Sequence, residues 1–146
     1  MPLDPDHFAR RLVQGIPDAI VYADAAGLIQ VWNAGAERLF GFTEQEALGL
    51  SLDIIIPKNI QGRHWEGYHH TMQTGVTRYG NGEVLSVPAL RKDGARISVE
   101  FTIVPFTGED GRMTGIAAIM RDATARFEEV RALRKKLADS PSPPPA

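Results

Sequence analysis

Three of the chain's four histidines lie close together, at positions 64, 69 and 70. Imidazole is a frequent metal ligand and titrates near neutral pH. Residues 57–74 around the three histidines have the pattern of a helix, with a proline suited to its first turn and Gly75 after its end. On a helix, spacings of five and one place the three rings on different faces. The histidines are therefore not expected to form a zinc set.

His64 differs from the other two because it belongs to an apolar stripe. Ile60, His64, Tyr68 and Met72 recur every four residues, which places them on one side of the helix. That side should face the domain interior, whereas the other two histidines should lie at an edge or in solvent. A histidine on such a stripe has two interpretations: a hydrogen-bonded core residue, or the ligand of a bound cofactor.

The composition limits the class of protein. The chain has 146 residues, 43% of them hydrophobic, as in a single globular domain. Without cysteine, disulfides, thiolate catalysis and cysteine-based zinc sites are excluded. A net charge of −2 predicts no nucleic-acid partner. No apolar run is long enough to span a bilayer, so we expect a cytoplasmic protein without membrane association. No phosphate-loop or nucleophile motif indicates an enzyme.

Start and stop signals divide the first half of the chain into short elements. Asn33 stands where a helix N-cap belongs, and Thr43 opens a capping box with Glu46. The Asp24-Ala-Ala-Gly27 segment is a turn between two strand-like runs. The expected elements are helices at 6–15, 34–40, 43–49 and 57–74, and strands at 18–24 and 28–32.

The second half is typical of strands. Between residues 97 and 103 apolar and polar side chains alternate, which is the period of a strand with one buried face. Turn signals at 92–94 and 108–111 separate it from expected strands at 77–90 and 113–121. Together these elements predict an α+β fold: a five-stranded antiparallel sheet with helices on one face and flanking helices at both ends.

The run at residues 28–49, LIQVWNAGAERLFGFTEQEALG, resembles the PAS sensor family, in which a strand ending in Trp-Asn leads into a helix with a Leu-Phe-Gly core. The Arg-Lys-Asp-Gly turn at 91–94 and the Arg-Asp-x-Thr exit at 121–124 extend the resemblance. Together with the apolar stripes of the terminal segments and the proline-rich end, it predicts four segments: an amphipathic helix at 1–16, a PAS domain at 17–123, a C-terminal helix at 124–139 and a disordered tail at 140–146.

The histidine-bearing helix has a more specific resemblance. Pro57, six residues, His64 and a final Thr74-Gly75 are similar to the haem-binding helix of oxygen-sensing PAS domains in bacterial histidine kinases. The Arg-His-Trp-x-Gly-Tyr run at 63–68 is also similar to carbon-monoxide-responsive PAS regulators. The resemblance implies haem b with His64 as the axial ligand of the iron, which leaves the opposite position open.

A porphyrin needs an apolar slot and partners for its two propionates. The resemblance implies His70 and Arg78 as propionate partners. The residues expected to line the slot come from the helical segment and the later strands: residues 54–56, Tyr68, Met72, Leu85, Val99, Phe101, Ile103 and Ile119.

One position departs from the oxygen-sensing kinases, which place an arginine on the strand after this helix to hold oxygen. Residues 84–86 occupy that place here and are Val-Leu-Ser, so oxygen held by an arginine is not expected. Carbon monoxide, redox sensing and simple haem binding remain open. Met72, Met113 and Met120 are candidate sixth ligands, with core packing as the alternative for each.

The expected function is that of a sensory PAS module, without catalytic activity, that binds haem and passes a gas or redox change to its flanking helices. The alternative is a dimerisation and protein-interaction module that binds no ligand, or binds flavin or another small organic molecule. Apolar stripes on the terminal helices predict a homodimer, and an effector protein in trans is the second partner considered.

Overall fold

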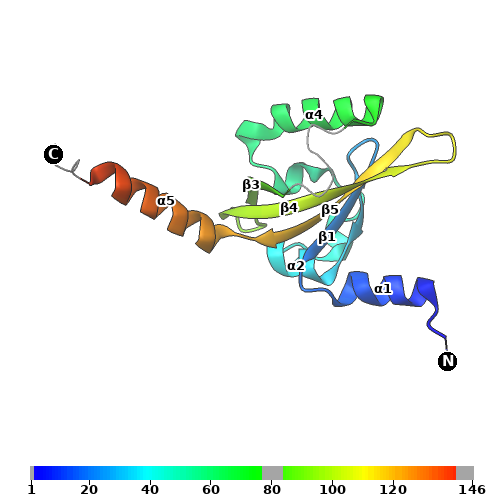
Figure 1. The fold of residues 1–146 in the computed structure, drawn as a ribbon. Helices are drawn as coiled ribbons and strands as arrows, with labels where there is room; N and C mark the ends of the chain where they lie inside the picture. The colour runs from blue at the N-terminus through cyan, green and yellow to red at the C-terminus, as the bar shows by residue number, and fades with distance from the viewer. Residues whose placement is uncertain (1, 77–83, 141–146) are drawn as a thin grey trace, which may run out of the picture.

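The structure is a computed structural model that describes residues 2–76 and 84–140. Figure 1 shows a sheet with helices packed against it and one helix at each end of the chain. In chain order the elements are α1 (Pro5–Gly15), β1 (Ala19–Asp24), β2 (Ile29–Trp32), α2 (Ala34–Phe40), α3 (Glu44–Ala47), the 3₁₀ helices η1 (Leu52–Ile55) and η2 (Lys58–Ile60), α4 (Gln61–Thr74), β3 (Leu85–Leu90), β4 (Arg96–Thr107), β5 (Met113–Asp122) and α5 (Thr124–Asp139).

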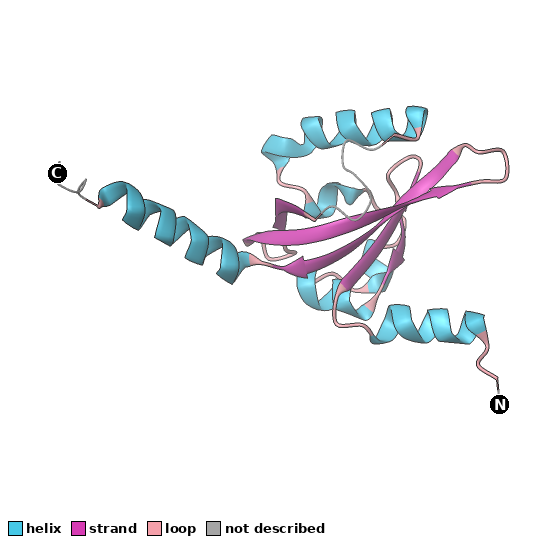
Figure 2. Cartoon of the chain, viewed as in Figure 1, coloured by secondary structure: helices cyan, strands magenta, loops and turns pink. Residues whose placement is uncertain are grey.

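The five strands form one sheet in the order β2-β1-β5-β4-β3, and every neighbouring pair is antiparallel. Figure 2 shows the strands of this sheet together with the helices that surround it. β5, the last strand in the chain, is the central one, and the β4–β5 pairing is the longest. The α+β prediction of a five-stranded antiparallel sheet with flanking helices is confirmed.

The predicted caps form as the sequence indicates. The Asn33 side chain accepts a hydrogen bond from the Ala36 amide at the start of α2. Thr43 and Glu46 form both hydrogen bonds of a capping box at α3. Gly41 and Gly75 follow the ends of α2 and α4 with positive φ angles, a conformation that glycine adopts without steric cost.

Two predicted boundaries need correction. The histidine-bearing helix starts at Gln61, because the chain before it forms η1 and η2 instead of a first α-helical turn. Pro57 explains this: Ile56, the residue before it, is extended, as the proline ring requires of its neighbour. The strand predicted at 77–90 is observed from Leu85; the remainder of that segment, 77–83, lies outside the described residues.

The core lies between one face of the sheet and the helices α2, α3 and η1. Its largest fully buried apolar side chains are Trp32, Phe40, Ile29 and Val99. The indole Nε1 of Trp32 donates a hydrogen bond to the Phe42 carbonyl oxygen, so its one polar atom is satisfied inside the core. We call this face of the sheet the inner face.

The two terminal helices are held only at one end. Neither α1 nor α5 contains a buried residue. Figure 1 shows α5 extending away from the sheet. The Asn33 amide donates to the Val13 carbonyl oxygen and so attaches α1 to the start of α2. In the described part of the chain, no helix is long and apolar enough to cross a membrane.

Candidate functional site

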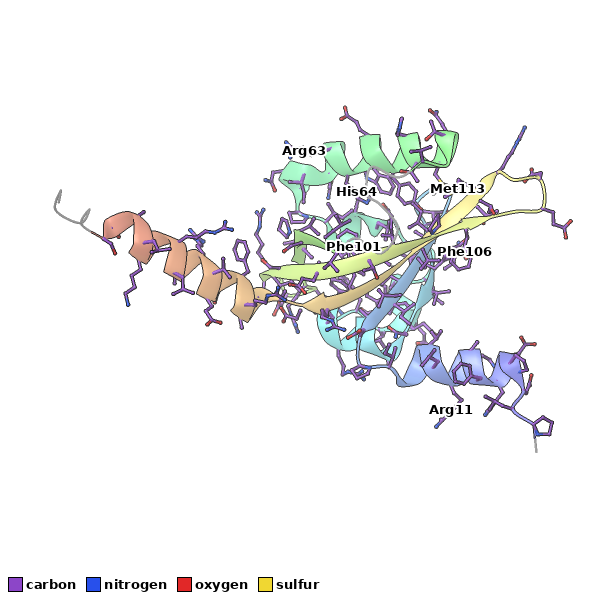
Figure 3. All side chains as sticks on the ribbon, in the orientation of Figure 1. Arg11, Arg63, His64, Phe101, Phe106 and Met113 are labelled. Atoms are coloured by element: carbon purple, nitrogen blue, oxygen red, sulfur yellow. The ribbon has the colours of Figure 1, made fainter. Side chains whose placement is uncertain are left out.

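His64 lies on the side of α4 that faces the sheet (Figure 3). The ring is partly buried, and its Nδ1 atom is buried without a hydrogen-bond partner in the part of the chain that the structure describes. Buried polar atoms are nearly always hydrogen-bonded, so an orphaned ring nitrogen marks a place where a ligand could complete the structure. In the same view Phe101 of β4 lies across from this side of α4.

Burial also sets the charge state of His64. Desolvation lowers the pKa of the imidazole below its usual value; the carboxylate of Asp53 opposes this shift and the nearby His69 adds to it. A lowered pKa keeps the ring neutral at pH 7, so a nitrogen lone pair is free to bind a metal. Neutral imidazole is the form that ligates iron.

Two aromatic residues of α4 pack against the His64 ring. The ring centroids of His64 and Trp65 are 4.7 Å apart with the planes at 77°, and the Tyr68 centroid is 5.7 Å from that of His64. The Trp65 indole donates a 2.7 Å hydrogen bond to Asp53. The buried Tyr68 hydroxyl lies 3.1 Å from the Ala23 carbonyl oxygen and 2.5 Å from that of Asp24. α4 is thus attached to η1 and to the end of β1.

Most of the predicted slot residues share the inner face of the sheet. Directly paired residues of antiparallel strands point to the same side. Phe101 pairs with Leu85 on β3 and with Met120 on β5. Val99 and Ile103 lie two residues before and after Phe101 on β4, so they share its face. The structure therefore places Leu85, Val99, Phe101 and Ile103 on the face toward which His64 points.

The prediction that Ile119 lines the same slot is wrong. Ile119 pairs with Thr102 on β4 and with Ile20 on β1, which are on the opposite face of the sheet from Phe101. The run 116–120 is apolar throughout, so its pattern could not tell which residues face inward. Met120 takes the inner position instead and is buried in the core cluster, which accounts for it as a packing residue.

The other predicted site residues fall in three places. Tyr68 is buried and Met72 partly buried on the stripe that contains His64, and His70 is exposed on the same helix. Met113 is partly buried at the start of β5, near the β4–β5 turn (Figure 3). Arg78 lies outside the described residues.

Two open hollows are found away from His64. One of about 400 Å³ is bordered by the end of α2 and the β3–β4 turn. The other, of about 260 Å³, is bordered by the start of β1, α2 and the end of β5. Within residues 2–76 and 84–140, no group of three or more His, Asp or Glu side chains is arranged to hold a metal ion.

Sequence reasoning missed the residues that attach α4 to the rest of the domain. Asp53 is the single charged residue in the apolar run 52–56, a signal that its side chain has a specific partner. The sequence pattern predicts only a turn at Gly27, but the ring of Trp65 packs where a Cβ atom of residue 27 would be. These contacts join residues far apart in sequence, which periodicity does not report.

Residues 8–123 match the PAS fold family, and the chain therefore belongs to the PAS family. PAS domains are sensory modules, and the order of strands and helices described above is that of the family.

Two relatives of known name are similar to this chain over part of their length. The chain is 31% identical over 129 residues, 84% of its length, to the sensor protein FixL of Bradyrhizobium diazoefficiens, of which it covers 25%. It is 26% identical over 107 residues, 73% of its length, to the oxygen sensor protein DosP of Escherichia coli K12, of which it covers 13%. The chain thus spans a quarter or less of these relatives.

Solved structures agree on the fold. A PAS domain from Colwellia psychrerythraea superposes with a TM-score of 0.72 at 25% identity and covers 84% of this chain and 99% of its own. An RNA-binding Light-Oxygen-Voltage receptor superposes with a TM-score of 0.74 at 19% identity, over 94% of this chain and 40% of the receptor. The second likeness concerns the fold alone.

Proposed function

We propose that this PAS domain is a haem-based sensor in which His64 is the axial ligand of the iron. The observation that carries the proposal is the buried His64 Nδ1, which has no hydrogen-bond partner within residues 2–76 and 84–140. Burial keeps this ring neutral, and the ring faces the inner face of the sheet. Bound haem would supply an iron with one axial position open to a small gas molecule.

The residues around His64 suit this group. Phe101, Ile103 and Leu85 present apolar surface on the inner face, and Val99 is buried beside them. Tyr68 and Met72 continue the stripe of His64 along α4. His70 and Arg78 are the proposed propionate partners; His70 is exposed on α4, as a contact to a charged group at the edge of a slot requires.

The relatives support a sensory role. One is named a sensor protein and another an oxygen sensor protein. The residues at the oxygen-binding arginine's place are Val84, Leu85 and Ser86, which favours a ligand with little need of polar contact, such as carbon monoxide, or a redox change. We propose that the change reaches α1 and α5, the flanking helices, and through them a second copy or an effector protein.

Absorption spectroscopy tests the haem proposal. Protein produced with haem supplied is expected to show a Soret band that moves on reduction and again on addition of carbon monoxide. His64→Ala should lose this spectrum, and added imidazole should restore it, which separates loss of the ligand from unfolding. His7→Ala, an exposed histidine on α1, is the matched control and should keep the wild-type spectrum.

The absence of a Soret band in the wild-type protein would refute the proposal, and so would an unchanged spectrum in His64→Ala. Mass spectrometry of the denatured protein then decides between the alternatives, because flavin or another small organic ligand would be released with its own mass.

The terminal helices favour a second candidate function, dimerisation with a second copy of the chain. Phe8 and Leu12 of α1 are about half exposed, and the stripe on α5 is exposed by 41 to 75%: Phe127, Val130, Leu133 and Leu137. Apolar stripes of this kind need a partner in water. Sedimentation of the full chain should give a dimer, and removal of residues 1–16 and 126–146 should give a monomer. A monomeric full chain would contradict this function.

A further inference from the structure

The His64 ring has no hydrogen bond of its own among the described residues, yet it is packed in one orientation. A metal-binding histidine usually owes its orientation to a hydrogen bond from its second ring nitrogen. Here no hydrogen bond to either ring nitrogen is found among the described residues, so whichever nitrogen binds the metal, the other has no such partner. The orientation must therefore come from the position of α4 and from the two aromatic rings, Trp65 and Tyr68, that pack against His64 and against each other.

Trp65 attaches α4 on one side. Its indole donates to the Asp53 carboxylate at 2.7 Å, and its ring meets the edge of His64 and stacks on His69. The same ring covers Gly27 in the β1–β2 turn and occupies the space a Cβ atom would need. Gly27 has a φ of +82°, so both the turn conformation and the close approach of the indole require glycine.

Tyr68 attaches α4 one helical turn later. Its hydroxyl donates to the carbonyl oxygens of Ala23 and Asp24, the last two residues of β1, and burial raises its pKa, so it stays a donor. The turn it reaches is itself rigid, because the Asp24 carboxylate accepts hydrogen bonds from the Ala26 and Leu28 amides.

We infer that Trp65 and Tyr68 are positioning residues for His64, and that the β1–β2 turn, residues 24–28, is part of the support of the histidine site. The inference deepens the proposed function and rests on it for the role of His64 toward iron. The same contacts connect the histidine site to α5. Ala23 and Asp24 pair with Ile116 and Gly115 of β5, and β5 is the strand that leads into α5.

Tyr68→Phe and Trp65→Phe test the inference, because each removes one donor and keeps an aromatic ring. In the ferrous haem protein the iron–histidine stretching frequency, measured by resonance Raman, should shift, and haem affinity should fall by about tenfold. Thr102→Val is the control: it removes a hydroxyl from β4, and the pairing of Thr102 with Ile119 places residue 102 on the opposite face of the sheet. It should leave both quantities unchanged.

Wild-type frequency and affinity in both variants would overturn the inference. If the wild-type protein binds no haem, the proposed function fails, and hydrogen exchange of the haem-free protein still decides whether the attachment exists. Tyr68→Phe should then speed exchange both in α4 and in the β1–β2 turn. Faster exchange in α4 alone, or in neither segment, would show that the turn does not support the histidine helix.

Discussion

Helices α2 and α4 differ in how they are held to the same domain. α2 has seven residues, a side-chain cap at its start and three buried residues. Its last carbonyls also accept hydrogen bonds from Arg91 and from the Lys92 amide in the β3–β4 turn. α4 is twice as long, has no side-chain cap at its start and buries only Tyr68 and Thr71.

The comparison shows that the two helices have different structural roles. The short helix is part of the packed framework, whereas the longer one carries the candidate ligand and is attached through two aromatic side chains. Elements with few buried contacts open at lower free energy than the core, and binding elements are drawn from that class. We therefore expect substitutions at matched positions of the two helices to have unequal effects.

Glycine substitutions give the largest contrast. A Cβ atom at Gly35 of α2 would collide with the backbone carbonyl of Asp18, so Gly35→Ala should lower the free energy of unfolding by about 3 kcal/mol or more. Gly67 of α4 has open space around it, and Gly67→Ala should raise it by about 0.5–1 kcal/mol through helix propensity. Urea unfolding measures the free energy of unfolding of both variants. Equal changes in the two variants would contradict the difference between the two helices.

Asn33 is the next most sensitive position. Its fully buried side chain accepts from the Ile20 and Ala36 amides and donates to the Val13 and Asp18 carbonyls. Asn33→Ala leaves these groups without a partner and should cost about 2–3 kcal/mol. The same urea experiment measures it. A loss below 1 kcal/mol would show that water replaces the amide.

Tyr68→Phe should have a smaller effect on stability, because α4 contributes less to the core. Loss of one buried hydroxyl donor is expected to cost about 1 kcal/mol. Thermal or urea unfolding without haem measures this loss. A cost as large as that of Asn33→Ala would mean that α4 belongs to the framework, contrary to the comparison.

The smallest effect expected is a pH dependence from His64. Because burial holds its pKa in the folded protein below the usual 6.5, the unfolded chain takes up the proton first as the pH falls. This contribution to stability is complete above pH 6.5 and is lost as the pH falls through the lowered pKa. Wild type should therefore lose stability below pH 6.5 more steeply than His64→Asn, and parallel curves would contradict the burial of His64.

The local elements were predictable from the sequence, because their signals are local. Asn33, Thr43 and Glu46 form the caps that their types and spacing predict, and the stripe of Ile60, His64 and Tyr68 faces the sheet as four-residue spacing requires. The alternation at 97–103 likewise places Val99 and Phe101 on the inner face.

What the sequence did not predict depends on tertiary contacts. β5 is apolar on both faces because it is the central strand, so Ile119 and Met120 could not be told apart by pattern. The hydrogen bond from Trp65 to Asp53 and those from Tyr68 to the end of β1 join segments 12 to 45 residues apart. Such contacts need the register of the sheet and the placement of α4 before they can be named.

At the junction between β5 and α5, a small rotation of the helix base produces a larger displacement at the far end of α5. β5 ends at Asp122, whose carboxylate accepts a hydrogen bond from the Thr124 amide, and the Ala123 amide donates to Ser98 on β4. The sixteen residues of α5 extend about 24 Å at 1.5 Å per residue, so tilting its base by about 10° carries the far end about 4 Å. A displacement too small to disturb the sheet is thereby magnified at the end of the helix.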